Sequence, residues 1–244
     1  MKITRFKTLE STNQYLQNLL NEGIDIVDNI VVTDYQTSGR GQGKNVWESE
    51  DGKNLLFSIA LDMSFLKAEN QFLLTQIVSV TMINVLKKYL PEESLSIKWP
   101  NDIYFNDKKI AGILIKNEIR GMMMGTSIIG IGLNVNQTSF NEDLPNPISM
   151  KMITGNDFEL EELLSAISYQ LSTVNGQQQI FNFQFSTFNY TNKLYRYKQW
   201  ALYEHEGQVK EMMITGYDQF GRLILKEKND REVVCDLKEI SFKV

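Results

Sequence analysis

The chain has 244 residues, of which 42% are hydrophobic and 23% are charged, and a net charge of −5 at neutral pH. This acidic balance argues against general nucleic-acid binding, which needs a basic surface. The single cysteine excludes an internal disulfide framework, and the single histidine, His205, excludes a multi-histidine metal site or a zinc site of Cys and His. His205 stands in a polar stretch typical of a solvated turn. No signal peptide or apolar run of roughly 20 residues is evident, so we expect a cytoplasmic protein without membrane contact.

The first elements expected along the chain are a helix and two strands. Ser11 is a suitable helix cap, Gln14 can reach back as a capping box, and Gly23 is a suitable stop. Residues 30–35 are rich in β-branched side chains and residues 54–61 are mostly apolar, so both segments are predicted strands, the second buried on both faces. A long helical pattern then covers residues 68–89 and ends before Pro91.

The segment from 95 to 136 has the close turn spacing of an antiparallel meander, with strands expected at 95–98, 103–105, 110–115 and 126–136. Helical patterns follow at 158–174 and 178–192. Short strands at 209–215, 222–227 and 232–237 then predict a small SH3-like barrel. The expected fold is therefore α+β, with a central mixed or antiparallel sheet flanked by helices in residues 1–197 and an SH3-like domain in residues 198–244.

A glycine-rich loop follows the first predicted strand, at residues 36–47. Its alternating glycines, which include Gly39 and Gly41, allow backbone N–H groups to converge on an anion, and Arg40 adds a planar fork of donors that suits phosphate or carboxylate. The spacing is not that of a P-loop, and Trp47 stands where the helix of a dinucleotide-binding fingerprint would begin. Taken alone, the loop fits an anion site and an ordinary surface loop equally well.

The most distinctive segment is the tryptophan-proline turn within residues 98–102, because proline and the residue before it are both conformationally restricted. We expect this rigid turn to present Lys98, Asn101 and Asp102, and Lys109 follows shortly after it. Simpler interpretations remain open for each: the tryptophan can be a core residue, Asp102 a turn cap and Lys109 a solvated hairpin lysine.

The predicted strand at 128–136 places Gly130, Gly132 and Asn134 on one face. Glycines weaken a strand interior unless another group must come close to the backbone. That group can be a flat ligand lying on the sheet or a helix packed over the strand, and the pattern alone does not separate the two.

Taken together and in order, four motifs resemble the biotin–protein ligase family. They are Ser11-Thr12-Asn13, Gly39-Arg40-Gly41, the 98–102 turn with Lys109-Ile110-Ala111-Gly112, and Gly130-Ile131-Gly132-Leu133-Asn134. The resemblance covers most of the chain. It implies a catalytic domain of the class II synthetase-like type that uses biotin, ATP and Mg²⁺ to form biotinyl-5′-AMP with release of pyrophosphate. It also implies transfer of biotin to a lysine of a biotin carboxyl carrier protein domain.

The same resemblance implies roles for individual residues. Arg40 and Lys109 would neutralise charge where the biotin carboxylate meets the α-phosphate, and Asp102 would orient or deprotonate the acceptor lysine. The implied binding residues are Ser11, Thr12 and Gln36 for the ureido ring, Gly39 and Gly41 for the anions, Trp47, Asn101 and Asn134 for the nucleotide, Gly112, Gly130 and Leu133 for the pocket floor, and Asn13, Gln42 and Lys98. No metal site built from protein ligands is expected.

This sequence departs from the family pattern in three places. Gln42 and Gly43 stand where some relatives have a second basic residue, for which Lys44 could compensate. Lys116 stands at an often acidic position, for which Glu118 could substitute on the same strand face. The helix-turn-helix domain of the regulatory branch has no counterpart before the Ser-Thr-Asn motif, so DNA binding is not expected.

Three rival functions follow from the same residues. A lipoate–protein ligase would share the two-step logic but would not need ureido partners such as Ser11, Thr12 and Gln36. A non-catalytic biotin or nucleotide sensor would need fewer charges than Arg40 and Lys109 provide. A structural SH3-like adaptor would leave the first 190 or so residues unexplained. The sequence is compatible with a monomer and with a side-by-side homodimer.

Overall fold

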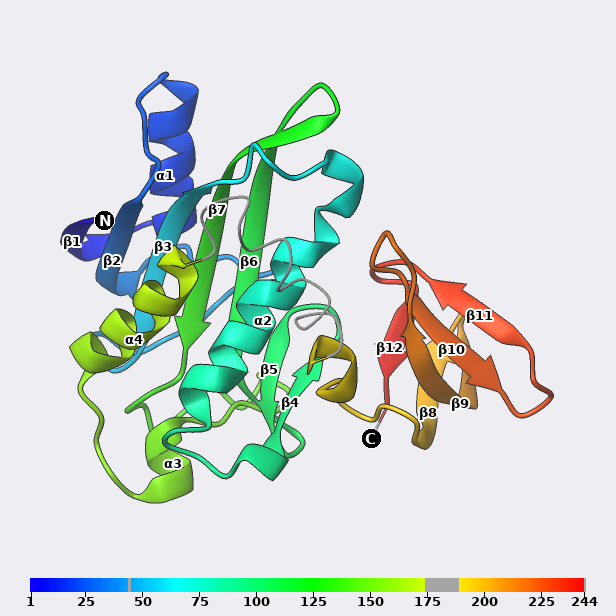
Figure 1. Cartoon of the computed structure of the whole chain (residues 1–244). Helices are drawn as coiled ribbons and strands as arrows, with labels where there is room; N and C mark the ends of the chain where they lie inside the picture. Colours follow the sequence, from blue (N-terminus) through cyan, green and yellow to red (C-terminus); the bar gives the residue numbers. More distant parts are fainter. Residues whose placement is uncertain (44, 174–188, 244) are drawn as a thin grey trace.

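The computed structural model describes residues 1–43, 45–173 and 189–243, and most of it is built around a seven-stranded mixed sheet. The strand order is β1-β2-β3-β7-β6-β5-β4 (Figure 1). Only the β1–β2 pair in this sheet is parallel. The strands are β1 (Lys2–Leu9), β2 (Asn29–Gln36), β3 (Leu55–Asp62), β4 (Leu95–Lys98), β5 (Asp102–Phe105), β6 (Lys108–Arg120) and β7 (Met123–Leu133).

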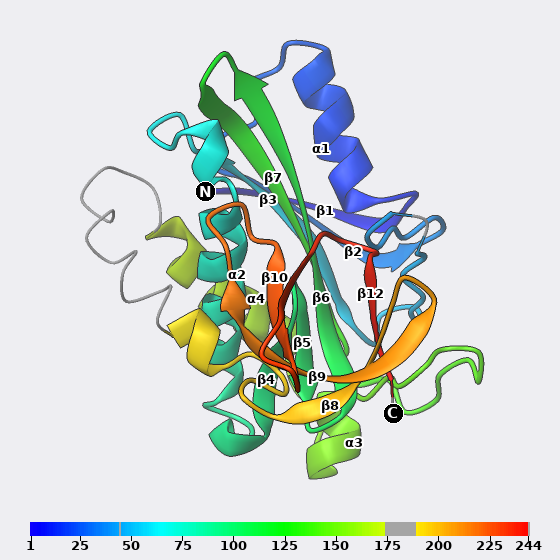
Figure 2. The same ribbon diagram turned by 90° about the vertical axis from the view of Figure 1, so that its right-hand side faces the viewer.

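Helices cover both faces of this sheet, which confirms the predicted α+β class. They are α1 (Thr12–Asn21), α2 (Phe72–Leu86), α3 (Met150–Thr154) and α4 (Leu160–Ser172). Figure 2 shows α2 and α4 on one side of the sheet and α1 on the other. Because side chains alternate along a strand, Phe57 of β3 points into the core under α2 and α4, whereas Ala60 belongs to a smaller core with Leu16 of α1.

The predicted meander is confirmed by the antiparallel pairing of β4, β5, β6 and β7. Gly121 makes the turn between the two longest strands, with a φ of +64° that favours glycine. Strand β6 extends to Arg120, well beyond the predicted end at 115, and β7 runs from 123 to 133 instead of from 126 to 136. The β6–β7 hairpin, in which both strands extend further than predicted, projects beyond the part of the sheet that the helices cover (Figure 1).

Several sequence predictions need correction. Strand β1 was not anticipated, because its side chains are largely exposed and lack an apolar pattern. Ser11 caps α1 as expected, but the amide of Gln14 donates to Asn18 and not back to the cap. Helix α2 is shorter than predicted and ends at Leu86, and the short helix α3 was missed. The helical pattern at 178–192 falls mostly on residues 174–188, outside the described residues.

A second sheet follows the central domain, and it is antiparallel with the order β11-β10-β9-β8-β12. This arrangement confirms the predicted C-terminal β-structure, with five strands where three or four were anticipated. Its strands are β8 (Trp200–His205), β9 (Gln208–Tyr217), β10 (Leu223–Glu227), β11 (Glu232–Cys235) and β12 (Ile240–Phe242). The indole of Trp99 donates to the carbonyl of Gly221 over 2.8 Å, and the ring of Phe72 on α2 contacts Tyr217 of β9.

None of the helices in the described part of the chain combines the length and the apolar character needed to cross a lipid bilayer.

Candidate functional site

A narrow cleft of about 100 Å³ lies on the α1 side of the central sheet. Its floor is formed by β6 and β7, one end by the start of α1, and its cover by the glycine-rich loop. The side chains at this cleft come from six separate segments of the chain, which the sheet brings together. Of the predicted site residues, those that line it are Ser11, Thr12, Asn13, Gln36, Arg40, Gly41, Gln42, Trp47, Asn101, Asp102, Lys109, Gly112 and Gly130.

The end of the cleft near α1 is a network of uncharged polar groups. The backbone N–H of Thr12 donates to Oε1 of Gln36 over 2.8 Å, and the Thr12 hydroxyl lies 3.2 Å from the same oxygen. The hydroxyl of Ser58 lies 2.7 Å from Oγ1 of Thr12 and 2.7 Å from Oδ1 of Asn13. The side chain of Ser11 is nearly buried beside them as the helix cap. The groups at this end can therefore donate hydrogen bonds to a neutral polar ligand and accept hydrogen bonds from it.

Asn13 is held against the sheet because β7 has no side chain at Gly130. The Asn13 amide donates to the carbonyl of Leu114 over 3.0 Å, and a Cβ at Gly130 would lie within 2.6 Å of that amide. Ser58 is the direct β3 partner of Gly130 and completes the contact. Ser58 was not among the predicted site residues, although a hydroxyl among the apolar residues of a predicted strand was an available signal.

The indole of Trp47 lies flat on a two-glycine surface. Gly112 of β6 and Gly132 of β7 are direct cross-strand partners, and a Cβ on them would lie 3.0 Å and 2.5 Å from the indole. The flat group that the strand glycines accommodate is therefore, in this structure, a side chain of the protein itself. Within the described residues, the buried Nε1 of Trp47 has no hydrogen-bond partner.

The glycine-rich loop closes on itself like a short hairpin. The N–H of Gly41 donates to the carbonyl of Asn45 over 2.8 Å, and the N–H of Trp47 donates to the carbonyl of Gly39 over 3.0 Å. A Cβ at Gly39 would overlap the carbonyl oxygen of Trp47, so only glycine fits there. Arg40 between these contacts is exposed and forms no ion pair within the described part of the chain. Lys44 lies outside the described residues.

The opposite end of the cleft holds a lysine and a carboxylate. Nζ of Lys109 lies 2.7 Å from Oδ1 of Asp102, and the two side chains are 32% and 27% exposed. Asp102 is the only acidic residue among the described residues that line the cleft. The Lys109 ammonium also lies 5.6 Å from the centre of the Trp47 ring, a cation–π distance. These contacts rule out the interpretation of Lys109 as a solvated hairpin lysine.

Hydrogen bonds to neighbouring segments hold the turn at 98–102 in place. The Trp99–Pro100 peptide is cis, and the hydroxyl of Tyr190 donates to the carbonyl of Pro100 over 2.7 Å. Burial raises the pKa of Tyr190 well above its usual value, so this phenol stays a neutral donor. The amide of Asn101 donates to the carbonyl of Ile113 on β6. Trp99 is buried, which confirms its interpretation as a core residue.

A second cavity of about 410 Å³ lies on the other side of Trp47 and shares both Trp47 and Lys109 with the cleft. Its far wall is more apolar and comes from Phe140, Leu144 and prolines of the same segment. Asn134 lines this cavity, while its amide donates to the carbonyls of Lys109 and Ile148. This asparagine therefore holds two walls of the cavity together.

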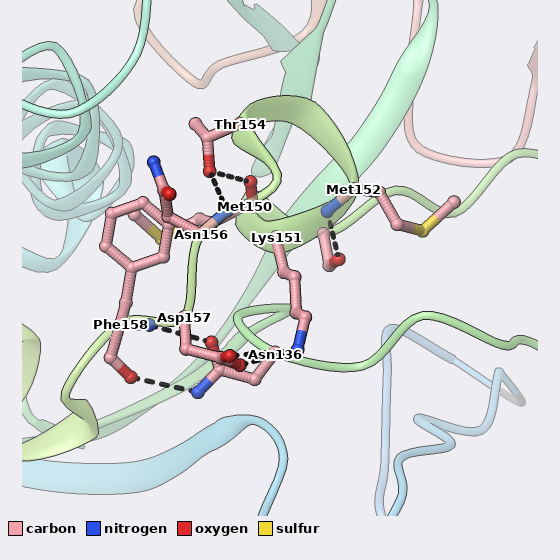
Figure 3. A network of polar contacts seen from close by, with 9 residues as sticks. Asn136, Met150, Lys151, Met152, Thr154, Asn156, Asp157 and Phe158 are labelled. Atoms are coloured by element: carbon pink, nitrogen blue, oxygen red, sulfur yellow. Dashed lines mark hydrogen bonds and ion pairs between the residues drawn. The ribbon is translucent and has the colours of Figure 1, made fainter.

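The segment that forms this wall is anchored where it returns to the core. Asn136 accepts from the N–H of Phe158 and donates to its carbonyl, at 2.9 Å each, and Lys151 pairs with Asp157 at 2.8 Å (Figure 3). The chain between Asn136 and Phe158 is thus closed into a loop that includes α3.

Three predicted site residues occupy other positions. Leu133 points into the core beneath α2 and α4, since it has the opposite parity to the glycines of β7, so its side chain is not part of the pocket floor. Gly39 is buried at the base of the loop. Lys98 donates to the hydroxyl of Tyr104 over 3.0 Å and lines a third cavity. Glu118 does not substitute in the site for Lys116, because it pairs with Arg120 near the hairpin tip, and this pair lowers its pKa.

Comparison with known sequences identifies one family. Residues 5–134 match the Biotin/lipoate A/B protein ligase family. Biotin–protein ligase 2 of Arabidopsis thaliana is 31% identical over 220 residues, covering 88% of this chain and 59% of that protein. The bifunctional ligase/repressor BirA of Bacillus subtilis (strain 168) is 35% identical over 131 residues, covering 53% of this chain and 39% of that protein. The chain therefore spans less than two thirds of the length of these relatives.

The fold has a close counterpart among solved structures. The biotin protein ligase from Aquifex aeolicus in complex with biotin and ATP aligns with a TM-score of 0.79, over 99% of this chain and 98% of that chain. Sequence identity in this alignment is 24%, so the likeness concerns the fold.

Proposed function

Since the chain belongs to the Biotin/lipoate A/B protein ligase family, we propose that it is an ATP-dependent biotin–protein ligase. In the first step, a carboxylate oxygen of biotin attacks the α-phosphorus of ATP. The bond from that phosphorus to the bridging oxygen breaks, and pyrophosphate leaves. In the second step, the amine of an acceptor lysine attacks the biotinyl carbonyl, AMP leaves, and the new amide nitrogen loses its extra proton.

The observation that carries this proposal is the position of the cations. The cleft and the cavity beyond Trp47 meet at Lys109, and Arg40 lines the cleft from the loop above. One cavity can hold biotin and the other the adenosine part of ATP, so that their reacting groups meet beside these two side chains.

The cations address the main obstacle to the first step, which is the approach of two anions. At an effective dielectric constant near 20, two unit charges about 4 Å apart repel by about 4 kcal/mol. A lysine ammonium and an arginine guanidinium at the junction offset this repulsion and stabilise the charge that develops on the phosphate. The reaction then needs positioning and charge more than a protein nucleophile, which suits a cleft whose described lining residues include neither histidine nor cysteine.

The polar end of the cleft suits the ureido group of biotin. A ureido ring offers one carbonyl oxygen and two N–H groups, and the hydroxyls of Ser11 and Thr12 together with the amide of Gln36 offer matching donors and acceptors. Lipoate carries a dithiolane ring that has no such groups. The uncharged polar end therefore favours biotin over lipoate.

The nucleotide side suits MgATP as the second substrate. Mg²⁺ is usually held by substrate phosphates and water with one or two carboxylates, and Asp102 is the carboxylate nearest the junction. When bound, the ion would supply positive charge to the phosphates. Asp102 would exchange its contact with Lys109 for the incoming lysine ammonium, accept a proton from it, and orient the resulting neutral amine toward the biotinyl carbonyl.

The acceptor belongs to the proposal as well. We expect a biotin carboxyl carrier protein domain of a biotin-dependent carboxylase, in the cytoplasm, with the enzyme acting as a monomer or a homodimer. The acceptor must insert a single lysine into the Lys109–Asp102 end, because the opposite end of the cleft is closed by α1.

The decisive experiment is intact mass spectrometry of a carrier domain incubated with this protein and MgATP, with biotin or lipoate. A gain of one biotinyl group at the acceptor lysine, absent without ATP, is the expected result. Modification by lipoate alone would make the protein a lipoate ligase. Binding of biotin without modification of the carrier and without pyrophosphate release would make it a sensor.

A further inference from the structure

A lysine of the C-terminal sheet touches the glycine-rich loop. Lys238 lies in the turn between β11 and β12, and its side chain reaches across to Gly43. A Cβ at Gly43 would lie 2.9 Å from Cε and 3.0 Å from Nζ of Lys238. The ammonium is therefore next to the backbone of the loop that carries Arg40, although the two residues come from different parts of the fold.

Lys238 also borders a third cavity, of about 480 Å³, between the 98–102 turn and the C-terminal strand β12. Lys98 lines the same cavity from the 98–102 turn, where its ammonium contacts the Tyr104 hydroxyl and the ring of Phe242. This cavity shares Asn101 and Asp102 with the cleft, so the two spaces adjoin at the 98–102 turn.

The charges around this cavity favour an anion. Neither Lys98 nor Lys238 forms an ion pair among the described residues. Asp102 is the one acidic residue among the described residues that line this cavity, and it already pairs with Lys109. Lys238 also borders a separate cavity that is lined by Glu204, Glu206, Glu232 and Glu239, and Glu239 accepts from the N–H of Asp236 over 2.7 Å. In the cavity beside the 98–102 turn, two cations thus face one space whose single carboxylate has another partner.

The backbone of Lys238 gives a second, independent observation. Its φ is +72°, in the left-handed region where glycine is free of strain and a lysine is strained. The fold therefore holds a long cationic side chain at a position that a glycine would occupy without backbone strain. Such strain is tolerated where the side chain has a use.

We propose that Lys238, together with Lys98, binds the β- and γ-phosphates of ATP in this cavity and then holds the departing pyrophosphate. This inference rests on the proposed function and adds the leaving-group site to it. It also gives the C-terminal sheet a direct part in the first step, because the sheet supplies one of the phosphate-binding cations.

The test uses the full chain and the variant Lys238→Gly, which removes the ammonium and relieves the backbone strain. Biotin-dependent exchange between ATP and labelled pyrophosphate gives KM values for ATP, pyrophosphate and biotin in one assay. We expect the KM values for ATP and pyrophosphate to rise by about tenfold, as for the loss of one charge-assisted hydrogen bond, with the KM for biotin unchanged. The free energy of unfolding should stay the same or increase.

Two further variants complete the design. Lys238→Arg keeps the charge and should retain most of the ATP affinity. Lys226→Gln removes a lysine of β10 that pairs with Asp230 and should leave all three KM values unchanged. If wild-type protein exchanges pyrophosphate and Lys238→Gly has an unchanged KM for ATP and pyrophosphate, the inference is wrong and the proposed function stands. If the wild type shows no exchange, both are wrong.

Discussion

Single residues in this site have two sets of partners, one within the protein and one in the proposed reaction. Lys109 is the clearest case, since its ammonium contacts Asp102 and the face of Trp47 while it borders both cavities. Its backbone is fixed as well, because its N–H donates to the carbonyl of Asn146 over 2.8 Å. A lysine held in this way loses little freedom when an anion arrives, which strengthens its effect on a developing charge.

Lys109→Ala is therefore expected to reduce biotin-dependent ATP–pyrophosphate exchange by about 100-fold or more. The free energy of unfolding should fall by less than about 1 kcal/mol, because the ion pair with Asp102 is partly exposed. Exchange kinetics and urea denaturation measure the two effects. The matched control is Lys108→Ala, one residue earlier and exposed, which should leave exchange unchanged. Equal exchange in the two variants would remove Lys109 from the mechanism.

For single residues, the sequence identifies the charged side chains of the site better than the residues that hold them in place. Arg40, Asp102 and Lys109 stand in unusual local patterns, and all three line the cleft. Ser58 is a lone hydroxyl in an apolar strand, and its contact with α1 depends on strand pairing that its neighbours do not encode. The motif also could not show where the side chain of Leu133 points, because consecutive residues of a strand point to opposite faces of the sheet.

Among the elements, the glycine-rich loop depends most directly on backbone contacts. Two backbone hydrogen bonds close the loop, one between Gly39 and Trp47 and one between Gly41 and Asn45. Arg40 lies between them. The sequence predicted an anion-binding loop and excluded a P-loop, but it could not show that Trp47 would lie beneath the loop on the sheet. That position follows from Gly112 and Gly132 meeting on neighbouring strands, which only the register determines.

Substitution of the loop glycines should show a graded effect. Gly39→Ala would place a Cβ against the carbonyl of Trp47 and open the loop at its base, so we expect exchange activity to fall by about tenfold or more. Gly41→Ala would bring a Cβ within 3.2 Å of the Asn45 Cβ, a contact that a small shift relieves, and should cost less. Steady-state exchange assays at saturating ATP measure both. A larger loss in Gly41→Ala would contradict the role of the base of the loop.

The C-terminal sheet has a buried phenol that should make its stability depend on alkaline pH. Tyr203 of β8 is fully buried, its hydroxyl has no partner among the described residues, and burial raises its pKa from 10.0 to about 12. Because the folded pKa exceeds the unfolded one, this contribution to stability is complete below pH 10 and is lost as the pH rises toward about 12. Burial also raises the pKa of the Cys235 thiol from 9.0 to about 11, so the contribution of this thiol to stability is lost as the pH rises between these two values.

Tyr203→Phe is expected to flatten the loss of stability between pH 10 and pH 12, the window of the shifted phenol. Near pH 8 the variant should be as stable as wild type or up to about 1 kcal/mol more stable, because an unpaired buried hydroxyl is removed. Urea denaturation at both pH values measures this, with Tyr169→Phe as the control, since Tyr169 is 73% exposed. A clear destabilisation of Tyr203→Phe near pH 8 would show that the hydroxyl is hydrogen-bonded.

Over the whole molecule, the two sheets meet through a few specific contacts that the sequence did not reveal. The α+β class, the meander and the C-terminal strands were predicted from turn spacing and apolar patterns, whose range is only a few residues. The parallel strand β1 and the Trp99–Gly221 hydrogen bond join segments far apart in the chain, and no local pattern records them. The domain boundary after residue 197 remains a prediction.

Gly221 offers a direct measure of how firmly the two sheets are joined. It lies in the turn before β10 with a φ of +85°, its carbonyl accepts from the indole of Trp99, and a Cβ there would overlap the ring of Phe72 on α2. Gly207 of the same sheet is a matched control, because its φ is +72° and an added Cβ would meet no other atom within 4 Å.

Gly207→Ala should lower the free energy of unfolding by about 1 kcal/mol through backbone strain alone. Gly221→Ala carries the same strain and must also displace Phe72, so we expect an additional loss of about 1 to 3 kcal/mol in urea denaturation. A rise in the KM for ATP should accompany the loss, because Lys238 would move away from Gly43 with the displaced sheet. Equal losses in the two variants would mean that the C-terminal sheet shifts freely on the central one, and the phosphate site between them could not then be rigid.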